Sequence, residues 1–168
     1  MIHNDIIALL SLEPHPYEGG YFRRTYESDL SCNTKNGSRM LLTSIYFLLT
    51  KDSPIGCLCR NKSDIIHYHH IGASIKYTIV SPEGVLSEKI LGPHLADGET
   101  LQLLVPGGWW KASRLCPGDC DYGLISEAVS PGFEYADNDI ATEEQIQQLF
   151  PDIHPMLAEY IKRSSTYP

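Results

Sequence analysis

The most constraining feature of this sequence is its repeated alternation of short apolar segments with turns that contain glycine or proline. Segments rich in β-branched and aromatic residues cover 20–28, 39–50, 73–82, 85–91, 98–106 and 121–130. Within 73–82, Ile75, Tyr77 and Ile79 alternate with polar residues, which predicts a strand with one buried face. Segment 39–50, RMLLTSIYFLLT, is almost continuously apolar and predicts a central strand buried on both faces. Short strands at even spacing are typical of a β-sandwich or β-barrel.

The two ends of the chain carry helical patterns instead. Residues 4–12 predict a short amphipathic helix with Asn4 as its cap. Thr142 and Gln145 form a capping box for a helix that runs to Leu149 and stops before Pro151. A second helical stripe follows at Met156, Leu157, Tyr160 and Ile161. These helical stripes predict packing against the strands.

Length and charge restrict the organisation and the partners of the chain. Its 168 residues favour one domain over 1–168, with a core from about 12 to 140 and C-terminal helices from about 142 to 163. The formal net charge of −8 argues against nucleic acid or a membrane surface as partner, because both attract a basic face. No segment approaches the ~20 apolar residues of a membrane span, and the N-terminus lacks the features of a signal peptide. The five cysteines are expected to be free thiols in a reducing compartment. We therefore expect a cytoplasmic protein.

A histidine cluster, His67, His69 and His70, lies in the segment SDIIHYHHIGA. Imidazole is a common metal ligand, so a metal site is one interpretation. On a regular strand, however, His67 and His69 share one face and His70 lies on the other. Two further interpretations stay open: structural or surface histidines, and a pocket histidine that binds a ligand or moves a proton.

Four ordered motifs then point to a family. They are LEPHPYEGGYFRRTY (12–26), LLTSIYFLL (41–49), VPGGWWKAS (105–113) and SPGFEYAD (130–137). Together they resemble the RmlC-like cupin superfamily, specifically the cupin-5 family. The segment 61–72 is similar to its branch with the pattern NKS…IH..H.G. The resemblance implies an all-β fold, the double-stranded β-helix or cupin jelly roll with short terminal helices. It also implies a ligand pocket inside the barrel and a homodimer.

The same resemblance allows the metal question to be examined residue by residue. The four metal-ligand positions of classical cupins correspond to Cys59, Asn61, Ile65 and Lys111. Ile65 has no donor atom, and Lys111 would have to lose its proton to bind a metal. We therefore expect no metal ligands of the classical kind and no cofactor.

Metal-free epimerases of the RmlC-like fold imply a different chemistry. They use a histidine base supported by a carboxylate, and a tyrosine acid. By this resemblance His67 or His70 is the candidate catalytic residue. The candidate ligand-binding residues are Glu18, Tyr21, Arg23, Tyr77, Trp109 and Lys111.

Arg23 and the tryptophans also have structural alternatives. Arg23 could clamp an anion in bidentate fashion, or it could be an exposed charge. An aromatic at Trp109 or Trp110 could stack on a ring, or it could belong to the core, and alternation allows only one of the two to point inward. Glu134 and Asp137 are expected to be structural.

These observations lead to a first hypothesis and two alternatives. The first hypothesis is a cupin that binds a small molecule, anionic or otherwise polar and ring-bearing, without a classical metal site. The second is a metal-independent isomerase or epimerase that acts on a sugar-like or other polar substrate. The third is a metal-dependent oxygenase or lyase.

Overall fold

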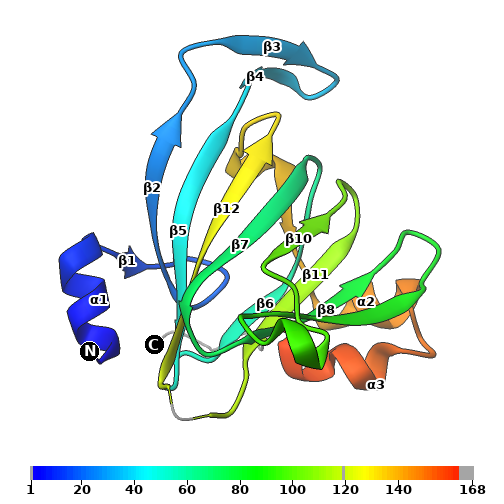
Figure 1. Ribbon diagram of the computed structural model, residues 1–168. Helices are drawn as coiled ribbons and strands as arrows, with labels where there is room; N and C mark the ends of the chain where they lie inside the picture. Colours follow the sequence, from blue (N-terminus) through cyan, green and yellow to red (C-terminus); the bar gives the residue numbers. More distant parts are fainter. Residues whose placement is uncertain (1, 119, 163–168) are drawn as a thin grey trace, which may run out of the picture.

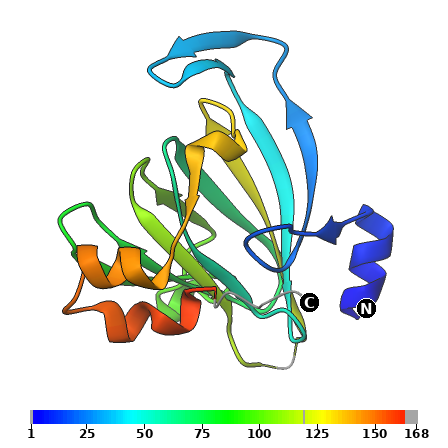
Figure 2. The same cartoon turned by 180° about the vertical axis from the view of Figure 1, so that it is seen from behind.

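The computed structural model describes residues 2–118 and 120–162, and these form two antiparallel sheets that face each other (Figures 1 and 2). One sheet contains, in spatial order, β1 (Glu13–Pro14), β2 (Tyr21–Glu27), β5 (Thr43–Thr50), β12 (Tyr122–Ser130), β7 (Asp64–Gly72) and β10 (Gln102–Val105). The other contains β13 (Asn138–Ile140), β6 (Ile55–Asn61), β11 (Trp110–Leu115), β8 (Ile75–Val80) and β9 (Leu86–Leu91). The chain crosses repeatedly between the sheets, which makes the fold the jelly roll that the resemblance implied.

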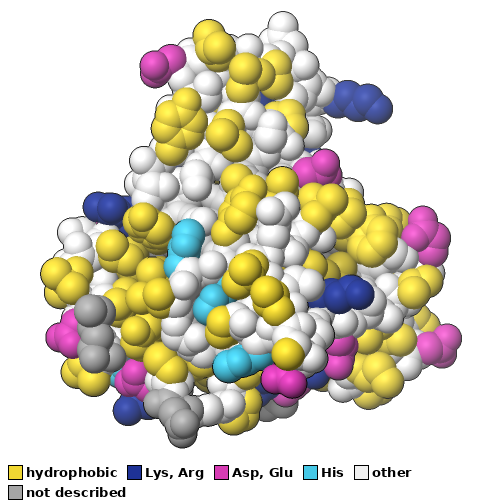
Figure 3. All heavy atoms as spheres, viewed as in Figure 1, with side chains coloured by type: hydrophobic (Ala, Val, Ile, Leu, Met, Phe, Trp, Pro, Cys, Tyr) yellow, Lys and Arg dark blue, Asp and Glu magenta, His cyan; other side chains and the backbone are white. Residues whose placement is uncertain are grey.

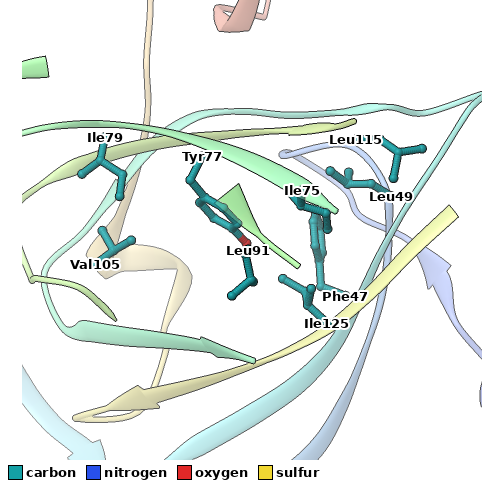
Figure 4. Close-up of a cluster of buried hydrophobic side chains, with 9 residues drawn as sticks. All are labelled: Phe47, Leu49, Ile75, Tyr77, Ile79, Leu91, Val105, Leu115 and Ile125. Carbon is teal, nitrogen blue, oxygen red and sulfur yellow. The ribbon is translucent and has the colours of Figure 1, made fainter. Parts of the chain in front are cut away.

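The space between the sheets holds the main hydrophobic core (Figure 4). Its buried members are Phe47, Leu49, Ile75, Tyr77, Ile79, Leu91, Val105, Leu115 and Ile125. Three of them come from one face of β8, which confirms the alternation expected in 73–82. The barrel is therefore filled by side chains over much of its length, and polar groups occupy only part of its interior.

The apolar run 39–50 does not form one strand. It is divided between β4 (Gly37–Met40) and β5, with the exposed Leu41 and Leu42 between them. β4 pairs with β3 (Ser31–Thr34) in a hairpin that projects beyond the barrel (Figure 1). The backbone of Leu41 and Leu42 bonds to residues 28–30, which lead into this hairpin. The prediction of a central strand was thus correct only for its second part.

The helices cover the outer faces of the two sheets. α1 (His3–Leu10) lies against the six-stranded sheet, where Ile6 packs with Leu48 and Leu124. It begins one residue before Asn4, and the Asp5 carboxylate accepts a hydrogen bond from the backbone N–H of Ile2 at 3.0 Å. Within the described part of the chain, no helix is both long and apolar enough to cross a membrane.

The C-terminal helices lie against the other sheet (Figure 2). They are α2 (Glu143–Leu149), α3 (His154–Leu157) and the 3₁₀ turn η3 (Ala158–Tyr160). The Thr142 hydroxyl accepts from the backbone N–H of Gln145 at 3.2 Å, which confirms the predicted N-cap. Ile146 and Leu157 pack with Trp110, so this tryptophan points out of the barrel.

Candidate ligand-binding site

A buried charged cluster lies inside the barrel, formed by Glu18, Lys111 and Glu127. Lys111 Nζ is 3.6 Å from Glu18 Oε2 and 3.6 Å from Glu127 Oε1. Each of the three side chains is at most 10% exposed. Lys111 comes from β11 and Glu127 from β12, whereas Glu18 comes from the segment between β1 and β2. One ammonium thus lies between two carboxylates that come from distant parts of the chain.

The charges of this cluster stabilise one another. Burial disfavours the charged form of Lys111, but Glu127 and Glu18 outweigh it and raise the pKa of Lys111 well above its usual value. Burial likewise disfavours the charged form of Glu127, yet Lys111 and His67 lower its pKa to about 2. At neutral pH the cluster therefore contains an ammonium and an ionised Glu127.

His67 extends the charged cluster toward the core. Its Nδ1 is 3.2 Å from Glu127 Oε1 and 3.2 Å from the Tyr77 hydroxyl. The first contact follows from strand pairing, because His67 of β7 and Glu127 of β12 are directly opposite each other. Burial lowers the pKa of His67, so the ring is neutral at pH 7.

The hydrogen bonds of His67 define its tautomer. An ionised carboxylate can only accept, so Nδ1 carries the proton and Nε2 holds a lone pair. Nε2 is buried and has no hydrogen-bond partner among the described residues. His67 is therefore a neutral imidazole whose unprotonated nitrogen faces no donor from the described part of the chain.

His15 is a second histidine at the charged cluster. Its Nδ1 accepts from the backbone N–H of Glu18 at 2.9 Å, which places the ring proton on Nε2. That Nε2 is 4.0 Å from Glu18 Oε1. Burial is the main cause that lowers the pKa of His15. His15 therefore offers a neutral N–H donor beside a carboxylate.

A cavity adjoins the charged cluster and opens to solvent. The centres of water-sized spheres can occupy about 40 Å³ of it, which is room for a few water molecules, and the cavity continues into open solvent. It is lined by His15, Glu18, Phe22, Arg24, Thr43, Ser44, Ile45, Phe47, Glu127, Val129, Phe133 and Tyr135. The polar end of the cavity is formed by His15, Glu18 and Glu127, and aromatic rings form much of the remaining wall. Such a mixture of apolar wall and few convergent polar groups is typical of a small-molecule site.

The mouth segment, residues 131–137, brings Phe133 and Tyr135 to the cavity and contains the 3₁₀ turn η2 (Tyr135–Asp137). It is attached to the projecting hairpin by a bidentate ion pair. Arg39 Nε and Nη2 lie 2.6 and 3.0 Å from the two carboxylate oxygens of the buried Asp137. The hydrogen bond from Arg39 is the largest cause that lowers the pKa of Asp137. Asp137 thus has the structural position that the sequence suggested.

Four candidate residues from the sequence lie together. They are Glu18, Lys111, His67 and Tyr77, which form or contact the charged cluster. Trp109 lies nearby, since it packs against the inner core and lines a small space with Lys111. Trp109 and Trp110 therefore point in opposite directions, as strand alternation requires.

The other three candidates lie outside the residues that line the cavity. Phe22 and Arg24 of β2 line it, so the intervening Arg23 points to the outer face. Tyr21 packs with the cluster beneath α1. His70 is exposed and its ring meets Tyr46 edge-on, with ring centroids 5.9 Å apart.

The residues at the classical metal positions do not fit a metal. Burial raises the pKa of the Cys59 thiol well above its usual value, and the Asn61 side chain accepts from the backbone N–H of Ser63 at 2.8 Å. Lys111 is directly opposite Cys59 on the neighbouring strand, and its ammonium lies between the two carboxylates, where a bound cation would be expected. Over residues 2–118 and 120–162 no group of three or more His, Cys, Asp or Glu side chains is arranged to hold a metal ion.

Sequence reasoning missed His15, Glu127 and the aromatic wall of the cavity. Glu127 is the only acidic residue in the strand 122–130, and a single carboxylate in an apolar strand is a recognisable signal. His15 lies between two prolines inside the first family motif. Phe22, Phe47 and Phe133 carried no signal that distinguishes a cavity wall from an ordinary core.

An antiparallel jelly roll with polar side chains inside the barrel and a cavity beside them defines the protein as a cupin. The chain belongs to the family described as "Cupin superfamily (DUF985)", whose model matches residues 4–141. It is 39% identical over 146 residues to "Uncharacterized protein YML079W" of Saccharomyces cerevisiae, which covers 79% of this chain and 72% of that protein.

Solved structures agree with this assignment. A hypothetical protein from Leishmania major is 30% identical, with a TM-score of 0.91 over 97% of this chain and 100% of that one. Protein SO0799 from Shewanella oneidensis is 32% identical, with a TM-score of 0.87 over 98% and 99% of the two chains. Oxalate decarboxylase from Bacillus subtilis, at 17% identity and a TM-score of 0.55 over 37% of its chain, shares the fold alone.

Proposed function

We propose that the protein binds a polar, ring-bearing small molecule in the cavity beside the charged cluster. The observation that carries this proposal is the joining of a solvent-accessible cavity to buried, oriented polar groups, Glu18, Glu127 and His15. Aromatic side chains along the wall offer stacking surfaces for a ring. The carboxylate oxygens can accept hydrogen bonds, and the imidazole N–H can donate one.

The proposal can be tested with a cavity-blocking variant. Ligand-observed NMR against a library of small polar ring compounds should detect ligands of the wild-type protein. Ile45→Trp would fill the cavity that Ile45 lines, so binding should be lost. Ile90→Trp is the matched control, because Ile90 is 40% exposed on β9 and is not among the residues that line the cavity.

Two results would contradict the proposal. One is a library without ligands for the wild-type protein at millimolar concentration. The other is a ligand that binds Ile45→Trp as well as it binds the control. If Ile45→Trp does not fold, amide chemical-shift mapping on the wild-type protein gives the same answer, since the shifts should centre on Phe22, Phe47 and Glu127.

A second candidate function is supported by the environment of His67. A neutral imidazole with its Nδ1–H held by a carboxylate can accept a proton at Nε2, and Tyr77 lies in contact with the same ring. This arrangement supports a metal-independent isomerase or epimerase. The cavity wall reaches Glu127 but does not include His67, so the substrate would have to approach past that carboxylate.

Hydrogen–deuterium exchange at carbon tests this candidate. Sugars and hydroxy acids that bind in the NMR screen would be incubated with enzyme in D₂O, and loss of a C–H signal would be recorded. Wild-type protein should catalyse the loss and His67→Gln should not, whereas the exposed His70→Gln should behave as wild type. Exchange that is absent, or unchanged in His67→Gln, would leave binding alone as the function.

A further inference from the structure

The polar end of the cavity carries a negative net charge. Glu18 and Glu127 contribute two carboxylates, whereas Lys111 contributes one ammonium. Burial lowers the pKa of both His15 and His67, so neither imidazole adds a positive charge at neutral pH. With two carboxylates and one ammonium, the charged cluster has a net charge of about −1.

No unpaired lysine or arginine in the described lining of the cavity reverses this balance. Among the described residues that line the cavity, Arg24 is the only lysine or arginine. Its Nη1 is 2.5 Å from Glu27 Oε2, and its Nη2 donates to the backbone carbonyl of Phe133 at 3.3 Å. Arg24 thus already has a carboxylate partner and helps to position the mouth segment.

Glu127 keeps one oxygen available to a ligand. Its contacts with Lys111 and His67 both use Oε1, and no described residue is a hydrogen-bond partner of Oε2. The Glu127 side chain is 9% exposed and lines the cavity. Oε2 is not among the buried polar atoms that lack a partner, so solvent reaches it, and a ligand that donates to it would make a charge-assisted hydrogen bond in place of water.

The aromatic wall also favours a positively charged ligand. Phe22, Phe47, Phe133 and Tyr135 line the cavity, and the faces of such rings attract cations. The Phe133 and Tyr135 rings meet edge to face, with centroids 5.2 Å apart, at the mouth segment. A cation that lies between these rings and Glu127 would be attracted from both sides.

We infer that the ligand of this cavity is an organic cation, with its ring against the aromatic wall and its positively charged N–H group at Glu127. This inference rests on the proposed function and adds the charge of the ligand to it. It replaces the anion that Arg23 and Lys111 suggested from the sequence, because Arg23 points outward and Lys111 is already compensated. A carboxylate or phosphate at this end would be repelled by Glu127 and Glu18 in a region of low dielectric.

Three compounds of nearly the same planar shape and different charge test the inference. Benzamidinium is a cation, benzamide is neutral and benzoate is an anion. Titrations followed by NMR should give benzamidinium binding about tenfold tighter than benzamide, and benzoate binding weakest, because charge-assisted hydrogen bonds and cation–π contacts favour the cation.

Variants locate the source of the preference. Glu127→Gln should bring the benzamidinium-to-benzamide ratio close to one while benzamide still binds. Glu88 is an exposed carboxylate on β9, so Glu88→Gln should leave the benzamidinium-to-benzamide ratio unchanged. If Glu127→Gln does not fold, Glu18→Gln should lower the same ratio.

The outcomes separate this inference from the proposed function. Equal binding of the three compounds, or tightest binding of benzoate, would overturn the cationic ligand and leave small-molecule binding intact. The same holds if benzamidinium fails to bind at millimolar concentration while library compounds bind in the cavity. If neither benzamidinium nor any library compound binds, both proposals are wrong.

Discussion

Lys111 is held in the barrel interior by two carboxylates, and the three groups depend on one another. Replacing it with methionine would leave Glu18 and Glu127 buried without their common partner. We expect Lys111→Met to lower the free energy of unfolding by about 3–5 kcal/mol, the usual effect of removing one partner of a buried ion pair. Urea unfolding followed by tryptophan fluorescence would measure it.

The matched control is a lysine in an exposed pair. Lys76 Nζ is 2.7 Å from Glu88 Oε1 at the surface, so Lys76→Met should change the free energy of unfolding by less than about 1 kcal/mol. Adding Glu127→Gln to Lys111→Met should recover part of the loss. A Lys111→Met variant as stable as Lys76→Met would show that the charged cluster does not contribute to folding.

The buried histidines predict a pH dependence of stability. Burial lowers the pKa of His15 and His67 in the folded protein, so below about pH 6.5 the unfolded chain binds more protons than the folded one. The free energy of unfolding should therefore fall from pH 7 to pH 5, and His67→Gln should show a smaller fall. An unchanged slope in both His67→Gln and His15→Gln would contradict this.

Glu127 adds a second, more acidic range. Its pKa is about 2 in the folded protein, below the value of about 4.3 for an unperturbed glutamate. The stability that its ionised form contributes is complete above about pH 4.3 and should be lost as the pH falls toward 2. Glu127→Gln should lack this part of the acid unfolding.

The charged cluster shows how far sequence can predict a site. Glu18, His67, Tyr77 and Lys111 could be found because family motifs or residue chemistry mark them. Glu127 carries a local signal as the single acid of its strand, but its partner could not be assigned, because its role depends on lying opposite His67 in a strand pair that joins segments about sixty residues apart. Register between distant strands is a property of the assembled sheet, and no local pattern determines it.

At the level of elements, the mouth segment and the β3–β4 hairpin are connected by the buried Asp137 carboxylate and by a backbone hydrogen bond from the Gly132 N–H to the Met40 carbonyl at 2.7 Å. Asp137 receives two hydrogen bonds from Arg39, and Lys62 Nζ is 3.4 Å from the same side chain. We expect Asp137→Asn to accelerate amide hydrogen exchange about tenfold in both segments, because the ion pair between them is lost and only the backbone hydrogen bond of Gly132 to Met40 remains. Glu88→Gln is the surface control, and exchange confined to the mouth segment would show that the hairpin is held by other contacts.

Element prediction worked where apolar and polar residues alternate and failed where the chain changes partners. In β8, Ile75, Tyr77 and Ile79 face the core between the sheets as the alternation predicts, although Thr78 and Val80 on the other face are buried as well. In 39–50, apolarity continues through Leu41 and Leu42 although both are exposed, so composition gave no sign of the boundary. The boundary is set by backbone pairing with residues 28–30, which a periodicity argument does not include.

At the level of the whole molecule, the outer face of the six-stranded sheet is only partly covered. α1 packs over its lower part, and hydrophobic side chains spread across the remaining surface (Figure 3). Exposed hydrophobic residues in or beside this sheet include Tyr26, Ile71, Leu101 and Leu104. β10 is an edge strand, and exposed apolar edges favour association. We expect a homodimer that buries this face.

Light scattering at micromolar concentration should give about twice the chain mass of 18.8 kDa. Leu104→Glu should shift the protein toward monomer, because it places a charge in the proposed interface. Leu95→Glu, at an exposed position of the 3₁₀ turn η1 (Leu95–Asp97), should remain dimeric. A wild-type mass of about 19 kDa would contradict the expectation.

The position of Lys111 has a further consequence for how the protein becomes competent to bind. A metal centre must acquire its ion from the surroundings, and chelators can remove that ion again. The ammonium between Glu18 and Glu127 is part of the polypeptide, so it is delivered by folding itself. The cavity should therefore keep its ligand affinity in EDTA and in cells starved of transition metals.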